Sequence, residues 1–197
     1  VVTSDGATWV GWLDDICFGD LRIQRITSGG EVIAIGGLVA EAETELCGNM
    51  DIAMWKLPDD SVVLQGGAAN TSIPLYRMAP DGTSLWPDGL FVSWIGGLGA
   101  VHGLANGDAL IGGYAGFSMF VTRVTSSGDE VWTAEIPVAS SSNKRLFGFV
   151  PDGNGGVYLV WDRPLAYTRM IEAMHLAETG VASWKSPTKV GVSRSSG

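Results

Sequence analysis

Side chains that could carry out acid–base or ligand chemistry are few in this chain and lie far apart along it. The two histidines are His102 and His175, and histidine is the side chain that titrates nearest to neutral pH. His102 stands four residues before a predicted turn at Asn106, and Trp55 stands four residues before a similar turn at Asp59. If the strands that carry them line a channel, His102 and Trp55 face into it and are candidate ligand-binding residues. The alternative is that the residue type differs between repeats at this position because the packing there is loose.

Three carboxylates crowd one predicted loop, at Asp14, Asp15 and Asp20. They are the candidates for a metal site, and solvated loop acids are the alternative. The run from Asp152 to Gly156 alternates oxygen donors, but it lacks the distal glutamate of a calcium-binding loop, so an Asp-Gly hairpin explains it better. We expect no zinc site, because the two cysteines and the two separated histidines lack the spacing of a zinc finger.

The two cysteines, Cys17 and Cys47, fall in predicted connections that emerge on the same face of the fold. We predict a disulfide between them, which would stabilise the fold by about 3–4 kcal/mol in the chain-entropy model. Such a bond indicates an extracellular or periplasmic protein. The alternative is two unrelated, partly buried thiols.

Sequence motifs for catalysis are absent. The chain has neither a G-x-S-x-G nucleophile elbow nor a phosphate-binding glycine loop, and its paired glycines are typical of turns and strand bends. The sequence therefore predicts no catalytic residue and no cofactor.

Composition excludes two classes of partner. The formal net charge is −9 and no cluster of lysine and arginine compensates for it, so a nucleic-acid backbone would be repelled. No apolar stretch approaches the roughly 20 residues that a membrane-spanning helix needs, so we expect no membrane insertion. With 46% hydrophobic and 17% charged residues, the chain has enough apolar surface to fold.

A repeat organises the chain. Four segments align on one pattern, QRITSGGEVI from Gln24, YRMAPDGTSLW from Tyr76, TRVTSSGDEVW from Thr122 and MHLAETGVASW from Met174. Each has Arg or His five residues before a glycine, and successive Arg or His positions are 52, 46 and 52 residues apart. A period of about 50 residues suits one four-stranded blade of a β-propeller.

Tryptophan follows the glycine by four residues in the last three repeats, at Trp86, Trp132 and Trp184, whereas the first repeat has Ala34 there. A large flat side chain can fill the space between packed sheets while its indole N–H finds one partner at the edge. We therefore interpret these three tryptophans, and the Arg or His position with His175, as structural.

Acidic or amide turns recur with the same period, at Ser4–Gly6, Pro58–Asp60, Asn106–Asp108 and Pro151–Gly153. Each separates two apolar runs, as in a hairpin. Together with the Arg and Trp segments they predict four antiparallel strands in each repeat. The chain is thus predicted to be one all-β propeller segment, residues 1–197, with repeats of approximately 1–48, 49–98, 99–143 and 144–197.

The segments LAETGVASW, APDGTSLW and TSSGDEVW resemble the tryptophan-docking repeats of PQQ-type β-propellers, and they are similar to repeats of secreted bacterial propellers more widely. That resemblance implies the propeller fold for all four repeats. The family includes quinone-dependent dehydrogenases and non-catalytic scaffold proteins. The dehydrogenases use a vicinal Cys-Cys pair that this sequence lacks, which argues against their activity.

An open propeller would expose a sheet face and strand edges. The four repeats are therefore expected to belong to a larger ring of about six to eight blades. The missing blades would come from further chain or from a second copy in a homodimer, and the alternative is a four-bladed ring that closes alone.

Propeller ligands bind at the channel mouth and on the face built by the loops, which here would carry Trp94, Tyr114, Asp162 and Arg163. With no convergent catalytic set in view, the sequence favours a non-catalytic extracellular module that binds a protein or glycan partner, or a structural component of an assembly. The alternatives are a lectin and a propeller enzyme with a quinone or metal cofactor.

Overall fold

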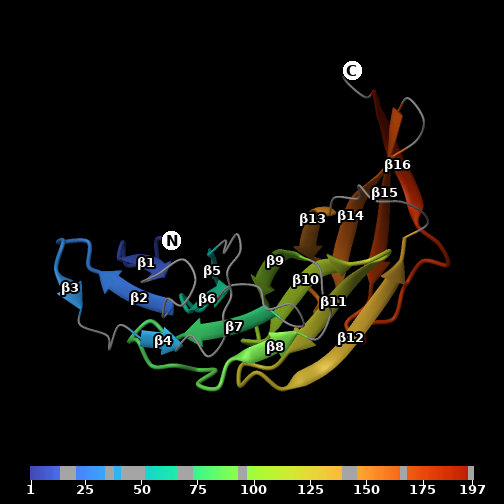
Figure 1. Ribbon diagram of the computed structural model, residues 1–197. Coiled ribbons are helices and arrows are strands. Elements are labelled where there is room, and N and C mark those ends of the chain that lie inside the picture. Colours follow the sequence, from blue (N-terminus) through green and yellow to red (C-terminus); the bar gives the residue numbers. More distant parts are fainter. Residues whose placement is uncertain are drawn as a thin grey trace. The chain divides into compact units, whose positions relative to one another are not determined.

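In the computed structural model, every regular element among the described residues is a β-strand (Figure 1). The described residues are 1–13, 21–33, 38–40, 52–65, 73–92, 97–138, 146–164 and 168–194. They form two compact units, Val1–Ile95 with Ser126–Gly128, and Gly96–Thr125 with Asp129–Gly197.

Unit 1 contains two antiparallel sheets of four strands each. In the first, β2 pairs with β1, β3 and β4; in the second, the order is β5-β6-β7-β8. The strands are β1 (Thr8–Leu13), β2 (Leu21–Ile26), β3 (Val32–Ile33), β4 (Leu38–Ala40), β5 (Ala53–Lys56), β6 (Val62–Gln65), β7 (Ile73–Met78) and β8 (Leu90–Val92).

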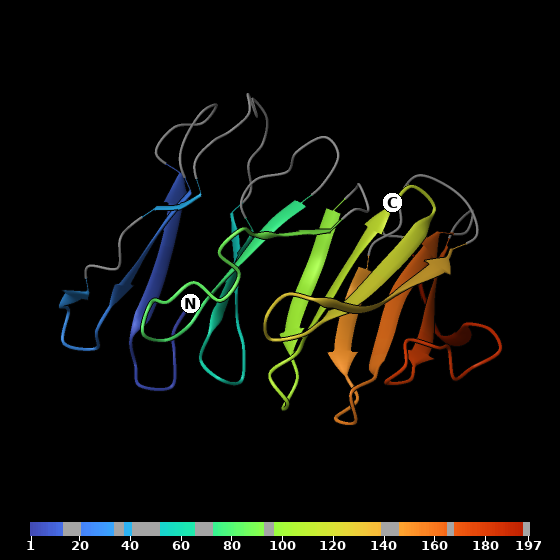
Figure 2. The same cartoon turned by 90° about the horizontal axis from the view of Figure 1, so that it is seen from below.

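Unit 2 contains two further antiparallel sheets, ordered β9-β10-β11-β12 and β13-β14-β15-β16. Strands that follow one another in sequence lie side by side in each sheet (Figure 2). The strands are β9 (Gly97–Gly103), β10 (Ala109–Ala115), β11 (Ser118–Val124), β12 (Glu130–Pro137), β13 (Leu146–Pro151), β14 (Val157–Pro164), β15 (Thr168–Leu176) and β16 (Thr188–Arg194). The predicted all-β class with four four-stranded antiparallel sheets is confirmed.

The fourth strand of two repeats begins later than predicted. The sequence suggests that the strand includes Trp86 and Trp184, but β8 starts at Leu90 and β16 at Thr188. Each tryptophan instead follows an isolated bridge, Met78 to Ser84 or Leu176 to Ala182. Proline lacks an N–H and cannot donate to a ladder, and Pro87 and Pro187 stand where the predicted strands would have continued.

The second strand of the β5-β6-β7-β8 sheet lies in the core. Val62, Val63 and Leu64 of β6 are all fully buried, as expected for a strand covered on both faces. In unit 2, one apolar cluster joins β10 and β11 to β14 and β15 through side chains that include Leu110, Val121, Leu159, Trp161 and Met174.

A glycine allows the two sheets of unit 2 to approach closely. A Cβ atom added at Gly112 of β10 would lie 3.2 Å from the ring of Phe149 on β13. That contact is tighter than ordinary van der Waals packing, so the missing side chain makes room for the Phe149 ring.

A salt bridge or hydrogen bond between a turn carboxylate and an Arg or His recurs in all four sheets; the Arg or His lies on β2 in the first sheet and on the third strand of the other three. The pairs are Arg25 with Asp5, Arg77 with Asp59 (2.8 Å), Arg123 with Asp108 (2.8 Å) and His175 with Asp152 (2.8 Å). In three sheets the pair ties the turn between the first two strands to the third strand, and in the first sheet it ties the turn before β1 to β2. We call the end of each sheet that carries these pairs the docking end.

Two of these carboxylates, Asp59 and Asp152, are held in their charged form. Burial acts to raise the pKa of Asp59, but hydrogen bonds from Ser61 and the charge of Arg77 together lower it below the usual value. Asp152 follows the same pattern: burial opposes ionisation, whereas hydrogen bonds from His175 and from the amides of Asn154 and Gly156 lower its pKa. Asp59 and Asp152 are therefore ionised at neutral pH.

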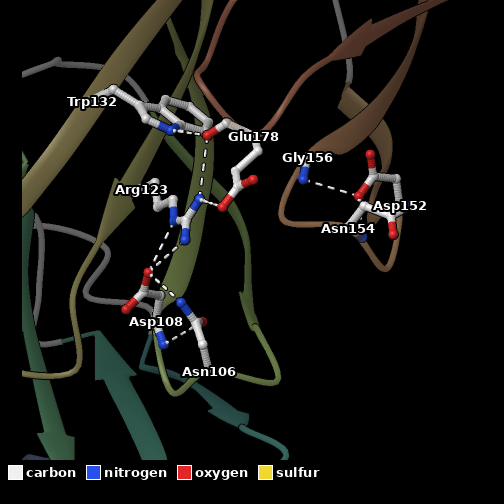
Figure 3. Close-up of polar contacts among 8 residues, drawn as sticks. All are labelled: Asn106, Asp108, Arg123, Trp132, Asp152, Asn154, Gly156 and Glu178. Atoms are coloured by element: carbon white, nitrogen blue, oxygen red, sulfur yellow. Dashed lines mark hydrogen bonds and ion pairs between the residues drawn. The ribbon is translucent and has the colours of Figure 1, made fainter.

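Two tryptophans complete the docking contact. In unit 1, Trp86 Nε1 donates to the carbonyl of Ser126 at 3.0 Å, and the Arg77 guanidinium lies 5.8 Å from the centre of the Trp86 ring. In unit 2, Trp132 Nε1 donates to the carbonyl of Glu178 at 2.7 Å, and Arg123 Nη1 donates to the same carbonyl at 3.3 Å (Figure 3). Arginine and tryptophan thus share one acceptor.

The repeated glycine provides the surface on which each ring rests. Gly128 and Gly180 both adopt positive φ, 94° and 78°. A Cβ at Gly128 would lie 3.0 Å from Trp86, and one at Gly180 would lie 2.7 Å from Trp132. Both the backbone conformation and the ring contact therefore require glycine.

Replacing Trp86 with Ala should lower the free energy of unfolding by roughly 3–5 kcal/mol, because this side chain is 2% exposed and its loss leaves a cavity beside Arg77. Trp132→Ala should cost less, because Trp132 is only half-buried. Urea unfolding followed by circular dichroism measures both. Equal losses for the two variants, or none for Trp86→Ala, would contradict the docking contact.

Candidate functional site

His102 lies on β9, the first strand of its sheet, opposite Leu110. Its ring is tilted against that of Phe149, with 5.2 Å between the ring centres. Burial lowers the pKa of His102 from its usual 6.5, although the Phe149 backbone acts in the opposite direction. The imidazole is therefore neutral at pH 7 and can accept a proton.

The opposite end of the same unit carries a second group of polar side chains. Arg163, near the end of β14, makes a 3.0 Å ion pair with Glu172 of β15. Trp161 Nε1 donates to the other oxygen of Glu172 at 3.2 Å, and Arg163 Nη2 contacts Met170 Sδ at 3.3 Å. The Arg163 side chain is 30% exposed, so it is held in place yet open to solvent.

The adjacent residue, Asp162, belongs to a different environment. It is fully buried and pairs with Arg169 of β15, whose side chain is 34% exposed. Successive side chains of a strand point to opposite faces, so Asp162 lies on the face opposite to Arg163. The two predicted site residues are neighbours in sequence but do not form one site.

Tyr114 lies at the same end as Arg163, on the other sheet of unit 2. It is 44% exposed, pairs in register with Met119 of β11, and precedes the 66% exposed Phe117. Paired residues share a face, and Met119 belongs to the apolar cluster that contains Trp161. Tyr114 and Arg163 therefore lie on the two sheet faces that pack against each other.

His102 is not part of this group. It pairs with Leu110, which is four residues from Tyr114 along β10, a separation of about 13 Å at the rise of an extended strand. Trp55, the other predicted channel residue, lies half-buried on β5 in unit 1. The remaining predicted site residues fall outside the described part of the chain: Trp94, the disulfide candidates Cys17 and Cys47, and the metal candidates Asp14, Asp15 and Asp20.

Sequence reasoning missed Trp161, Arg169 and Glu172. Trp161 and Glu172 pair across β14 and β15, so knowledge of the strand register would have indicated that they are partners. The length of the connection between the two strands does not by itself determine that register. Among the described residues, no group of three His, Cys, Asp or Glu side chains is placed to hold a metal ion.

The chain matches no protein-family model and no curated protein. It is similar to the solved structure of an ulvan lyase of polysaccharide lyase family PL25 bound to -[GlcA(1-4)Rha3S]-, with a TM-score of 0.58 and 12% identity, over 98% of this chain and 55% of that one. This likeness concerns the fold, and the chain spans about half of the lyase's length.

A second solved structure, of a putative 6-phosphogluconolactonase from Bacteroides fragilis, matches with a TM-score of 0.37 and 12% identity, over 98% of this chain and 70% of that one. A similarity this low supports no argument. The resemblance to PQQ-type repeats is tested by neither structure and stays a prediction.

These comparisons correct one expectation. The sequence favoured a non-catalytic binding or scaffold module because no catalytic motif is visible, yet the solved structure that resembles this fold, the ulvan lyase, is an enzyme, so a non-catalytic role is not supported. The absence of a short motif was a poor guide, because on a repeat fold the reacting groups come from separate strands and loops and need not form a local sequence pattern. The described part of the chain contains no helix long and apolar enough to cross a membrane.

The His102 environment makes a prediction about pH. The folded chain disfavours the protonated imidazole, so the unfolded chain binds this proton more readily, and the free energy of unfolding should fall as the pH decreases through 6.5 towards the lower folded pKa. His102→Gln should remove that part of the decrease. Urea unfolding at a series of pH values measures it, and NMR titration of the two imidazoles gives the folded pKa directly. Identical pH dependence in both proteins would contradict a neutral, partly buried His102.

Proposed function

We propose that the four sheets are blades of a β-propeller and that the chain is part of an enzyme that acts on an acidic polysaccharide. The propeller assignment is supported by the repeat period of about 50 residues, the four-stranded meanders and the likeness in fold to the ulvan lyase. A polymeric substrate of this kind is met outside the cytoplasm, so the proposal keeps the extracellular or periplasmic location that the sequence suggested.

The observation that carries the proposal is the setting of Arg163. Its guanidinium is oriented by Glu172, is supported by Met170 and remains 30% exposed. A planar guanidinium binds carboxylate or sulfate through two parallel hydrogen bonds. GlcA and Rha3S units, as in the saccharide of the ulvan lyase structure, carry these two groups.

Exposed aromatic side chains lie at the same end. Tyr114 and Phe117 offer flat surfaces on which the apolar face of a sugar ring can stack. The Tyr114 hydroxyl can also exchange a proton with a bound substrate. The arrangement therefore combines an anion-binding side chain, a stacking surface and a proton-transfer group.

The reaction class that fits this combination is β-elimination from a uronic acid unit. An arginine that neutralises the carboxylate makes the proton on the adjacent carbon easier to remove. The electrons of the broken C–H bond form a carbon–carbon double bond, the glycosidic C–O bond breaks, and the leaving oxygen takes up a proton. In the proposed site Arg163 binds the carboxylate. The Tyr114 oxygen accepts the proton from the carbon as its hydroxyl gives a proton to the leaving oxygen, so Tyr114 ends the step unchanged.

The test is an activity assay on a panel of sulfated and unsulfated acidic polysaccharides, followed by the ultraviolet absorbance of the unsaturated product. Arg163→Gln should lower kcat/KM by roughly 10- to 100-fold, because it removes a charge-assisted hydrogen-bond pair. Arg163→Lys should recover only part of the activity, because a lysine keeps the charge but not the fork.

Lys185→Gln is the matched control, since it removes one positive charge from an exposed position beyond β15, and its activity should equal that of the wild type. Tyr114→Phe tests the hydroxyl separately. No activity on any acidic polysaccharide, or full activity in Arg163→Gln, would refute the proposal.

A further inference from the structure

The last sheet exposes a face that is buried in the earlier repeats. The residue that pairs with the Arg or His, on the strand that follows the carboxylate turn, is Trp9 of β1, Val63 of β6, Leu110 of β10 or Tyr158 of β14. The first three are 1%, 0% and 0% exposed, whereas Tyr158 is 43% exposed. This side chain is apolar or aromatic in every repeat, but only in the fourth repeat is it exposed to solvent.

An ordered aromatic cluster occupies this open face. Tyr158 stacks on His175 with 4.5 Å between ring centres, and the Trp184 ring lies 6.3 Å from each of them. His175 is in turn held by Asp152 at 2.8 Å. Trp184 stands at the repeat position of Trp86 and Trp132, each of which donates its indole N–H to a carbonyl of a glycine turn. Within the described residues no such turn lies against Trp184.

The first repeat offers the complementary half of this contact. Gly30 has φ of 83°, close to the 94° and 78° of the two glycines that carry tryptophan rings. Its turn has the same backbone hydrogen bond, from Gly30 N to Thr27 O at 2.9 Å, as the turn at Gly180, where Gly180 N donates to Ala177 O at 2.9 Å. Among the described atoms, none lies within 4 Å of a Cβ added at Gly30, so the space that a tryptophan ring fills elsewhere is open.

The acceptor is also in place. The carbonyls that receive Trp86 and Trp132 belong to the residue two positions before the glycine, Ser126 and Glu178. In the first repeat that residue is Ser28, in the sequence Thr27-Ser28, which repeats the Thr125-Ser126 of the Trp86 acceptor turn.

We infer that Trp184 of one copy docks on the Gly30 turn of a second copy, so that the chain associates head to tail. The contact continues an interface that the chain already makes twice, with its donor half at one end of the repeat series and its acceptor half at the other. Trp184 Nε1 then donates to the Ser28 carbonyl, and the second copy covers Tyr158 and His175. Two such contacts close a dimer. This inference does not depend on the proposed substrate.

The experiment measures the oligomeric state of the full chain by native mass spectrometry and sedimentation equilibrium. The wild type should be a dimer with a concentration-dependent monomer fraction. Trp184→Ala and Gly30→Asn should each weaken association by roughly 30-fold or more, the range of a tryptophan at the centre of an interface. Asparagine tolerates positive φ, so Gly30→Asn keeps the turn and blocks only the ring.

Gly116→Asn is the matched control, because Gly116 also has positive φ and open space around its Cβ but lies at the opposite end of its sheet from the docking contacts. It should dimerise like the wild type.

Mixing the two weakened variants gives the sharpest test. Trp184→Ala keeps its Gly30 turn and Gly30→Asn keeps its Trp184, so the mixture can form one intact contact that neither variant can form alone. A mixed dimer in the spectrum is expected. Three results would overturn the inference: a wild type that is monomeric at all concentrations, unaltered dimers in both variants, or no mixed dimer from two folded variants. A monomer in which Gly30→Asn changes the Trp184 fluorescence would assign the turn of the same chain to that face.

Discussion

The structure depends on how each buried arginine is neutralised. Arg77 is 1% exposed, and an unpaired buried charge is among the most destabilising features a fold can contain. Its Nη2 donates to Asp59, its Nε donates to Ser61, and its guanidinium lies over the Trp86 ring. These partners come from two separate segments, the turn that holds Asp59 and Ser61 and the segment that holds Trp86. The requirement to satisfy one guanidinium therefore fixes the turn after β5 and the position of the tryptophan at once.

The first and last repeats show how the fold differs where the third partner or the arginine itself is missing. In the first repeat, which has Ala34 where the others have tryptophan, the Arg25 partner Asp5 has a side chain that is 56% exposed. In the last repeat His175 replaces arginine, keeps the carboxylate partner Asp152 and gains a stacked ring, Tyr158. A histidine has two ring nitrogens against five arginine donors, so it cannot both bind the carboxylate and span to a neighbouring turn as Arg123 does.

The sequence shows the period of the repeats, the glycine and tryptophan positions and the four strands, because each depends on local residue types. It does not reveal that the turn carboxylate and the arginine are partners, since they stand 20, 18, 15 and 23 residues apart in the four repeats and match no fixed spacing. The sequence allowed individual site residues to be predicted, but not which of them lie together. Asp162 and Arg163 appeared to be one site because they are adjacent, but strand alternation separates them, and the partner of Arg163, Glu172, is set by the register of β15.

The docking contacts and the proposed binding residue Arg163 lie at opposite ends of the same strands. The start of β14 lies at the docking end, next to the pair of Asp152 and His175, whereas Arg163 lies near the far end of this eight-residue strand. Eight residues of extended chain span about 26 Å. A charge or an aromatic ring at the far end can therefore change without disturbing an arginine–carboxylate pair or a tryptophan on its glycine. A scaffold held together at one end leaves the other free to carry loops of varied length and chemistry. Arg163 is held in position there by Glu172 from the neighbouring strand and remains partly open to solvent, as a side chain that receives an anionic ligand needs to be.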